Sequence, residues 1–298
     1  MSTLGEILAR FDDPAEAYQI LVESGNAPLV TKLDKMASEA GGDPCDLAFD
    51  AVRDFLAEAN DEAWVKLIGR MQDSSSPAGS CLSEMIAWAL NRWTIRQKGA
   101  VLGVVLAGGA SSRYGSDKAL APLDGIPLLQ RIVDQVGPQV DKVVLSGMAR
   151  PGYAVEVIAD EVVHAGPLAA LKTTLAWAEA RKFPLVMTFP CDAPFVPADT
   201  VKRLRVALRH GDCAVARRNG HDEPTCALWR TASRAKVDAA LASGIRSLRD
   251  AMARVDATGA DFSGVVAGPN GDPFFNINTR AAMADAEAWL RRKHTVLA

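Results

Sequence analysis

The sequence predicts two domains of different class, a small all-α domain followed by an α/β domain with a mostly parallel sheet. In residues 1–97 the apolar side chains recur at helical spacing, with no alternating strand pattern. From residue 98 onward, short apolar runs alternate with amphipathic helical segments. We therefore expect an acidic all-helical accessory domain at 1–97 and an α/β domain at 98–298.

Helix starts and stops are visible in the first part. Asp13-Pro14 and Asp43-Pro44 each place a capping carboxylate before a proline, the residue favoured at the first helical position. Gly25-Asn26 and Gly41-Gly42 are typical helix ends. The polar stretch DSSSPAGS at 73–80 predicts a loop, and the last helix is expected to end near Trp93.

The second part alternates strand and helix patterns. The apolar runs VLGVVLAGG, KVVLSG, VEVIAD and FPLVMTFPCD predict strands, and PLLQRIVDQV, GPLAALKTTLAWAEA and ADTVKRLRVALRH predict helices. Such alternation indicates a parallel sheet with helices on both faces. Because ligands of these sheets bind at the carboxyl ends of the strands, the functional residues are sought there.

Composition limits the function classes. Of 298 residues, 49% are hydrophobic and 23% charged, which is typical of a globular protein. Residues 1–98 carry 16 acidic and 9 basic side chains, whereas the remainder carries 20 acidic and 24 basic ones. This weakly basic second part fits a phosphate-bearing small ligand, and it is too weak to indicate nucleic acid as a partner.

Location is predicted from what the sequence does not contain. MSTLGEILARFDDP has no basic stretch before an apolar core, and no run approaches the roughly 18 apolar residues of a membrane span. The five cysteines form no C-x-x-C pair, which favours reduced thiols over disulfides or zinc ligands. We expect a cytoplasmic protein without a membrane partner.

The first candidate loop follows the first apolar run of the second part. Leu106-Ala107-Gly108-Gly109 allows the backbone N–H groups to approach a ligand closely, and Arg113 and Lys118 can neutralise a polyphosphate. The pattern matches neither the G-x-x-x-x-G-K-[ST] nor the G-x-G-x-x-G phosphate loop. An ordinary glycine turn with solvated cations is the alternative.

Asp192 is the candidate metal ligand. It lies in Pro190-Cys191-Asp192-Ala193-Pro194 after an apolar run, where a carboxylate beside a polyphosphate can bind Mg²⁺. The alternative is an aspartate that only terminates a strand. Asp160 ends the run VEVIAD and is placed where a ligand would lie.

Two amides form the last candidate pair. In Phe275-Asn276-Ile277-Asn278-Thr279, a strand would project both asparagines from one face, where a polar ligand could engage them. A turn that satisfies its own polar groups before the final helix at 280–293 explains them equally well.

Taken in order, these motifs resemble the molybdenum cofactor guanylyltransferases, which belong to the nucleotidyltransferases with a Rossmann-like fold. The resemblance runs from about residue 101 to the C-terminus, and residues 1–97 resemble no family. It rests on the ordered set GVVLAGG, Arg113, Lys118, VIAD, GPLA, PCDAPF, the PT…AL pattern at 224–228 and FNINT.

The resemblance implies a role for each candidate. Arg113, Lys118 and Asp192 would be catalytic, and Asp192 would bind Mg²⁺. Asn276 and Asn278 would lie near the metal on the pterin side. The nucleotide would be bound by Leu106, Ala107, Gly108, Gly109, Lys118, Ser146, Asp160 and Asp192. Two residues depart from the family pattern. Ser146 stands where the family often has asparagine, and Glu223 stands where histidine is common.

The implied reaction transfers GMP from GTP to the phosphate of molybdopterin and releases pyrophosphate. GTP and the molybdenum cofactor would be the substrates and Mg²⁺ the cofactor. Leu-Ala-Gly-Gly favours guanine, because the related cytidylyltransferases tend to have Leu-Ala-Ala-Gly. The alternatives are a related nucleotidyltransferase that uses another acceptor or CTP, and a protein that carries the cofactor without catalysis. The helical domain is expected to contact molybdoenzymes or their chaperones, and a solubility or dimerisation role is the alternative.

Overall fold

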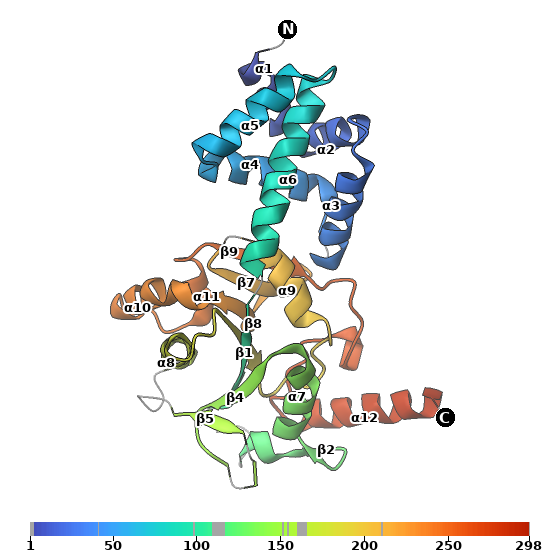
Figure 1. The fold of residues 1–298 in the computed structure, drawn as a ribbon. Coiled ribbons are helices and arrows are strands. Elements are labelled where there is room, and N and C mark those ends of the chain that lie inside the picture. The colour runs from blue at the N-terminus through green and yellow to red at the C-terminus, as the bar shows by residue number, and fades with distance from the viewer. Residues whose placement is uncertain are drawn as a thin grey trace. The chain divides into compact units, whose positions relative to one another are not determined.

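The computed structural model divides the chain into two compact units, Met1–Lys98 and Gly99–Ala298 (Figure 1). None of the helices in the described part is both long and apolar enough to cross a membrane. The structure describes residues 3–40, 42–97, 99–108, 117–150, 152–153, 155–159, 166–209 and 211–297.

Regular structure in the described residues of Met1–Lys98 is entirely helical. The predicted caps are present, since the Asp13 carboxylate accepts from the Ala15 N–H at 2.8 Å and that of Asp43 from the Cys45 N–H at 2.8 Å. The elements are α1 (Leu4–Ala9), η1 (Arg10–Asp12), α2 (Pro14–Glu23), α3 (Ala27–Ala40), α4 (Pro44–Glu58), α5 (Asp61–Gln72) and α6 (Pro77–Gln97).

The last helix corrects two predictions. The predicted loop at 73–80 is shorter, because α6 already begins at Pro77 and continues past Trp93 to Gln97. Proline starts a helix well, since its missing N–H has no intrahelical partner at that position. Gly79 lies in the first turn of α6. Any larger residue there would clash, because its Cβ would lie 2.8 Å from the Ser24 Cβ. The close packing of the two chain segments therefore requires glycine within the helix.

The second unit contains a seven-stranded sheet in the order β5-β4-β1-β6-β8-β7-β9. β8 is antiparallel to both its neighbours, and the other paired strands are parallel to each other. The predicted mostly parallel α/β sheet is therefore confirmed. The strands are β1 (Val101–Leu106), β4 (Lys142–Ser146), β5 (Glu156–Ile158), β6 (Leu185–Pro190), β7 (Cys213–Arg218), β8 (His221–Arg230) and β9 (Ala257–Asp261).

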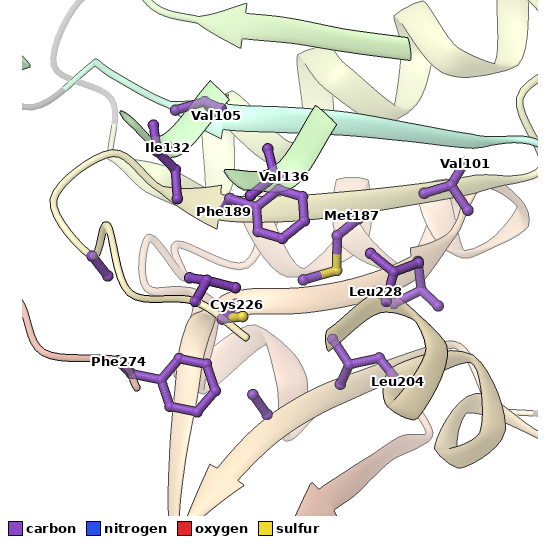
Figure 2. Packing of buried hydrophobic residues seen from close by; sticks show 14 of the residues in the cluster. Val101, Val105, Ile132, Val136, Met187, Phe189, Leu204, Cys226, Leu228 and Phe274 are labelled. Carbon is purple, nitrogen blue, oxygen red and sulfur yellow. The ribbon is translucent and has the colours of Figure 1, made fainter. Parts of the chain in front are cut away.

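Helices cover both faces of this sheet. One face packs against α7 (Leu128–Val136) and α9 (Thr200–Leu208), and it holds Val101, Val105, Met187 and Phe189 (Figure 2). The alternate strand residues, such as Leu102 and Val104, pack on the other face. The helices of that second face are α8 (Pro167–Ala180), α10 (Arg234–Ala242) and α11 (Leu248–Met252).

A separate, smaller apolar cluster includes the last helix. The long helix α12 (Arg280–Leu297) buries Met283, Ala286 and Leu290 against Phe195 and Leu128. It begins at the predicted residue and extends beyond the predicted end. The remaining short elements are η2 (Lys118–Leu120), β2 (Pro122–Leu123), β3 (Ile126–Pro127), η3 (Gly137–Gln139), η4 (Thr231–Ser233) and η5 (Pro269–Gly271).

The β7–β8 hairpin was not among the predicted elements, although the sequence carries a signal for it. Its turn is Asn219-Gly220, and both residues have positive φ, 50° and 78°. Asn-Gly is the favoured pair for a two-residue hairpin turn, because both central residues must adopt that conformation.

Phe189 tests the sheet core. Replacing this fully buried ring by alanine (Phe189→Ala) should lower the free energy of unfolding by about 3 to 5 kcal/mol, because the mutation removes buried area and leaves a cavity. Chemical denaturation of the full chain, followed by circular dichroism, measures the loss. Val266 is 84% exposed, so Val266→Ala should change the free energy of unfolding by less than about 0.5 kcal/mol. Equal losses in both variants would contradict the assigned packing.

Candidate active site

The carboxyl ends of three neighbouring strands meet at one edge of the sheet. In the register, Leu106 of β1 lies opposite Ser146 of β4 on one side and Pro190 of β6 on the other. The residues that follow these strands are therefore brought together from three distant parts of the chain. This is the edge at which open parallel sheets bind their ligands.

The start of the first loop is held closely against the end of β4. The Ala107 N–H donates to the Ser146 carbonyl at 3.0 Å, and Ser146 is only 1% exposed. Gly147 has φ +127°, and a Cβ on it would lie 2.9 Å from the Gly108 backbone. Leu106 is half-buried and packs against the core on the α8 face, so it contributes mainly backbone to this edge. The predicted Gly109, Arg113 and Asp160 lie outside the described residues.

Lys118, Asp192 and Asn278 form the centre of the candidate site. The Lys118 Nζ lies 2.7 Å from the Asp192 Oδ2 and 2.7 Å from the Asn278 Oδ1. The lysine and aspartate side chains are 18% and 20% exposed, so water screens this ion pair only in part. One ammonium group thus joins the three predicted segments, which lie up to 160 residues apart in sequence.

The backbone also fixes the asparagine segment to Asp192. The Ile277 N–H donates to the Asp192 carbonyl at 2.8 Å, and the Ile277 side chain is fully buried. The segment is irregular rather than extended in a strand, so the two amides do not share one set of partners. Asn276 Nδ2 donates to the Phe274 carbonyl at 3.1 Å, whereas Asn278 contacts Lys118.

Arg150 and Asp117 form an ion pair that the sequence analysis missed. The Arg150 Nε lies 2.7 Å from the Asp117 Oδ2, and the arginine side chain is only 7% exposed. The hydrogen bond from Arg150 lowers the pKa of the Asp117 carboxyl below its usual value, so the pair stays charged at neutral pH. No motif indicated it, because Arg150 follows β4 in a segment without a recognisable pattern.

Two further titratable groups lie near this edge, and burial raises the pKa of each. Burial raises the pKa of the Cys191 thiol to about 12, so Cys191 is protonated at neutral pH and is not a thiolate nucleophile. Burial, followed by the charge of Asp272, raises the pKa of Glu223, which lies opposite Ala216 at the start of β8. Because β8 runs antiparallel to β6, the start of β8, and Glu223 with it, lies on the side where β6 ends.

A pocket of about 580 Å³ borders this centre through Asp117, the residue before Lys118. Its walls come from η2 and the first turns of α12, with Leu120 and Met283 supplying apolar surface and Arg280 and Glu287 charge. In the described part of the chain, no three His, Cys, Asp or Glu side chains converge as a metal site. Oxygens of Asp192 and Asn278 do converge, on the Lys118 ammonium.

The chain resembles known proteins over part of its length. Residues 103–257 match the MobA-like NTP transferase domain. A molybdenum cofactor guanylyltransferase of Cereibacter sphaeroides is 36% identical over 197 residues, which are 64% of this chain and 98% of the relative. One from Mesorhizobium japonicum is 38% identical over 201 residues, covering 64% of this chain and 96% of the relative.

Solved structures show the same fold. Molybdopterin-guanine dinucleotide biosynthesis protein A from Archaeoglobus fulgidus superposes with a TM-score of 0.53 at 22% identity, over 64% of this chain and 99% of that one. The described helices α1 to α6 all lie before the residues that match the family domain. The chain therefore belongs to the family of MobA-like NTP transferases and carries a helical unit ahead of the family domain.

Proposed function

We propose that this protein transfers GMP from GTP to the terminal phosphate of molybdopterin, forming the guanine dinucleotide cofactor and releasing pyrophosphate. The observation that carries the proposal is the convergence of Lys118, Asp192 and Asn278 at the carboxyl edge of the sheet. It occurs in a chain whose relatives are named molybdenum cofactor guanylyltransferases.

The reaction makes modest chemical demands on the protein. An oxygen of the acceptor phosphate forms a bond to the α-phosphorus of GTP, and the bond from that phosphorus to the bridging oxygen of the β-phosphate breaks. Pyrophosphate carries away the electron pair of the broken bond. A phosphate nucleophile is already ionised at neutral pH, so the site needs alignment and positive charge rather than a strong base.

The donor set at the centre fits Mg²⁺. Mg²⁺ prefers oxygen ligands, and it commonly takes one or two from the protein and the others from water and substrate phosphates. The Asp192 carboxylate and the Asn278 amide oxygen would hold it, and the Lys118 ammonium is a cation at those same oxygens. When bound, the metal would neutralise charge on the phosphates and orient them.

The remaining roles follow from position. Lys118 would contact the phosphates of GTP once it leaves Asp192, and Arg113 would add a second positive charge. The pterin side would be formed by Asn276 and Asn278. The nucleotide is expected to lie along the edge formed by Leu106, Ala107, Gly108, Gly109, Ser146 and Asp160.

We place the reaction in the cytoplasm, because all five cysteines are free thiols, as is typical of reducing compartments. For the helical unit we propose contacts with molybdoenzymes or their chaperones. α5 supports this role, since Val65 is 70% exposed and Ile68, one turn further on, is 43% exposed.

Nucleotide selection gives the first test. With Mg²⁺ and molybdopterin, the purified protein should release pyrophosphate from GTP and should use CTP poorly, because its first loop reads Leu-Ala-Gly-Gly. A coupled phosphate assay measures the rates. Equal rates with both nucleotides would refute the guanine preference. Turnover only with another phosphorylated acceptor would show that molybdopterin is not the acceptor. Binding of cofactor without any turnover would favour a carrier.

Asp192 gives the second test. Asp192→Asn should reduce pyrophosphate release by about 100-fold or more, because the variant loses the carboxylate charge that the metal and Lys118 face. Asp199→Asn is the matched control. Its carboxylate pairs with Arg203 at 2.8 Å on α9, and neither residue is a candidate site residue, so the rate of this variant should stay within twofold of the wild type. A fully active Asp192→Asn enzyme would disprove this role.

Lys118 gives the third test. Lys118→Met should bind Mn²⁺ roughly fivefold more tightly than the wild type in the absence of nucleotide, because a competing cation has been removed. Electron paramagnetic resonance measures free Mn²⁺ directly, without turnover. The same variant should lose most of its activity with GTP. An unchanged Mn²⁺ affinity would show that metal and lysine do not share the two oxygens.

A further inference from the structure

Arg150 lies beside the candidate site without facing solvent. It follows β4 by four residues, and its side chain is 7% exposed. It is not among the residues proposed to contact GTP or molybdopterin. A buried guanidinium is costly unless hydrogen bonds satisfy it, so its partners indicate what it does.

Four hydrogen bonds satisfy this guanidinium. Nε donates to Asp117 Oδ2 at 2.7 Å, and Nη2 donates to Asp117 Oδ1 at 3.2 Å, so the carboxylate is held by two donors. Nη2 also donates to the Ala107 carbonyl at 2.9 Å. Nη1 donates to the Met148 carbonyl at 3.2 Å, which fixes the arginine to its own segment.

Ala107 and Asp117, the two partners outside the segment of Arg150 itself, flank residues 108–116 in the sequence. Ala107 directly precedes Gly108 at the end of β1, and Asp117 directly precedes Lys118. Asp117 Oδ1 also accepts from the Ala119 N–H at 3.1 Å, so the same carboxylate caps η2, the helical turn that begins with Lys118. A shift of Asp117 would therefore move Lys118.

We propose that Arg150 is a positioning residue for two groups of the nucleotide site, the backbone of Gly108 and the side chain of Lys118. Its guanidinium fixes Ala107, which precedes Gly108, relative to Asp117, which precedes Lys118. It thereby sets the backbone positions from which the Gly108 N–H and the Lys118 side chain would reach the phosphates of GTP. This proposal rests on the proposed function, because it takes GTP as the ligand of these two groups.

The geometry requires arginine. The planar fork binds both oxygens of Asp117 and still has a donor for the Ala107 carbonyl. A lysine would supply one compact charge without the fork. A glutamine is shorter and uncharged, so it would leave Asp117 without its cation.

Arg150→Gln should weaken GTP binding by about tenfold, measured by calorimetry on the full chain, because the charge-assisted hydrogen bonds that fix Ala107 and Asp117 are lost. KM for GTP should rise by a similar factor with a smaller change in kcat. Arg150→Lys should recover part of the affinity. Asp117→Asn should weaken GTP binding similarly, and adding Arg150→Gln to it should cost little more, because both changes break one interaction.

Arg131 is the matched control. It too bonds a backbone carbonyl, with Nε donating to Leu123 O at 2.8 Å, and its side chain is 20% exposed. Arg131→Gln should lower the unfolding midpoint and leave GTP affinity within twofold of the wild type.

Three outcomes would decide the question. Wild-type GTP affinity in Arg150→Gln or in Asp117→Asn overturns the proposal, and the second variant gives the answer if the first does not fold. Equal losses of GTP affinity in the Arg150 and Arg131 variants also overturn it, because they would show a general effect of stability. Absence of GTP binding by the wild type would instead refute the proposed function.

Discussion

The contact of the Lys118 ammonium with Asp192 and Asn278 is the interaction on which the candidate site depends. Both distances are 2.7 Å, and the three residues come from η2, from the turn after β6 and from the segment before α12. An unpaired carboxylate on Asp192, whose side chain is only 20% exposed, would be partly desolvated without compensation. The ammonium compensates for this desolvation in the absence of substrate. The site is thus assembled around a cation before any phosphate arrives.

The sheet explains why these segments meet. β1 lies between β4 and β6 in parallel register, so the loops after all three strands leave the sheet at the same edge. Aliphatic side chains on both faces hold this register, because a slip of one residue would move each of them to the opposite face. The positions of the polar groups are therefore set by the packing of apolar ones.

Sequence patterns predicted much of this arrangement, since apolar runs and helical periods reflect burial directly. They placed β1, β4, β5 and β6, and they put Asp192 at a strand end and Lys118 in the loop after β1. The structure brings these two residues together with Asn278. They could not reveal Arg150, because its partners, Ala107 and Asp117, are distant in sequence and one of them is a backbone carbonyl. They also missed the start of α6 at Pro77, where local polarity indicates a loop and close packing on Ser24 favours a helix.

Because β8 is antiparallel to its neighbours, the segments at the carboxyl edge of the sheet differ in how much their length can vary. The parallel strands β1, β4 and β6 each offer a carboxyl end, whereas β8, which runs in the opposite direction, offers its beginning and the Asn219-Gly220 turn. A hairpin turn can gain or lose residues at little cost, because it is exposed and closes on its own strands. Ala107 and Asp117, in contrast, are both bonded to Arg150, so their separation is fixed. The turn can therefore change in length while the contacts of Arg150 with Ala107 and Asp117 stay the same.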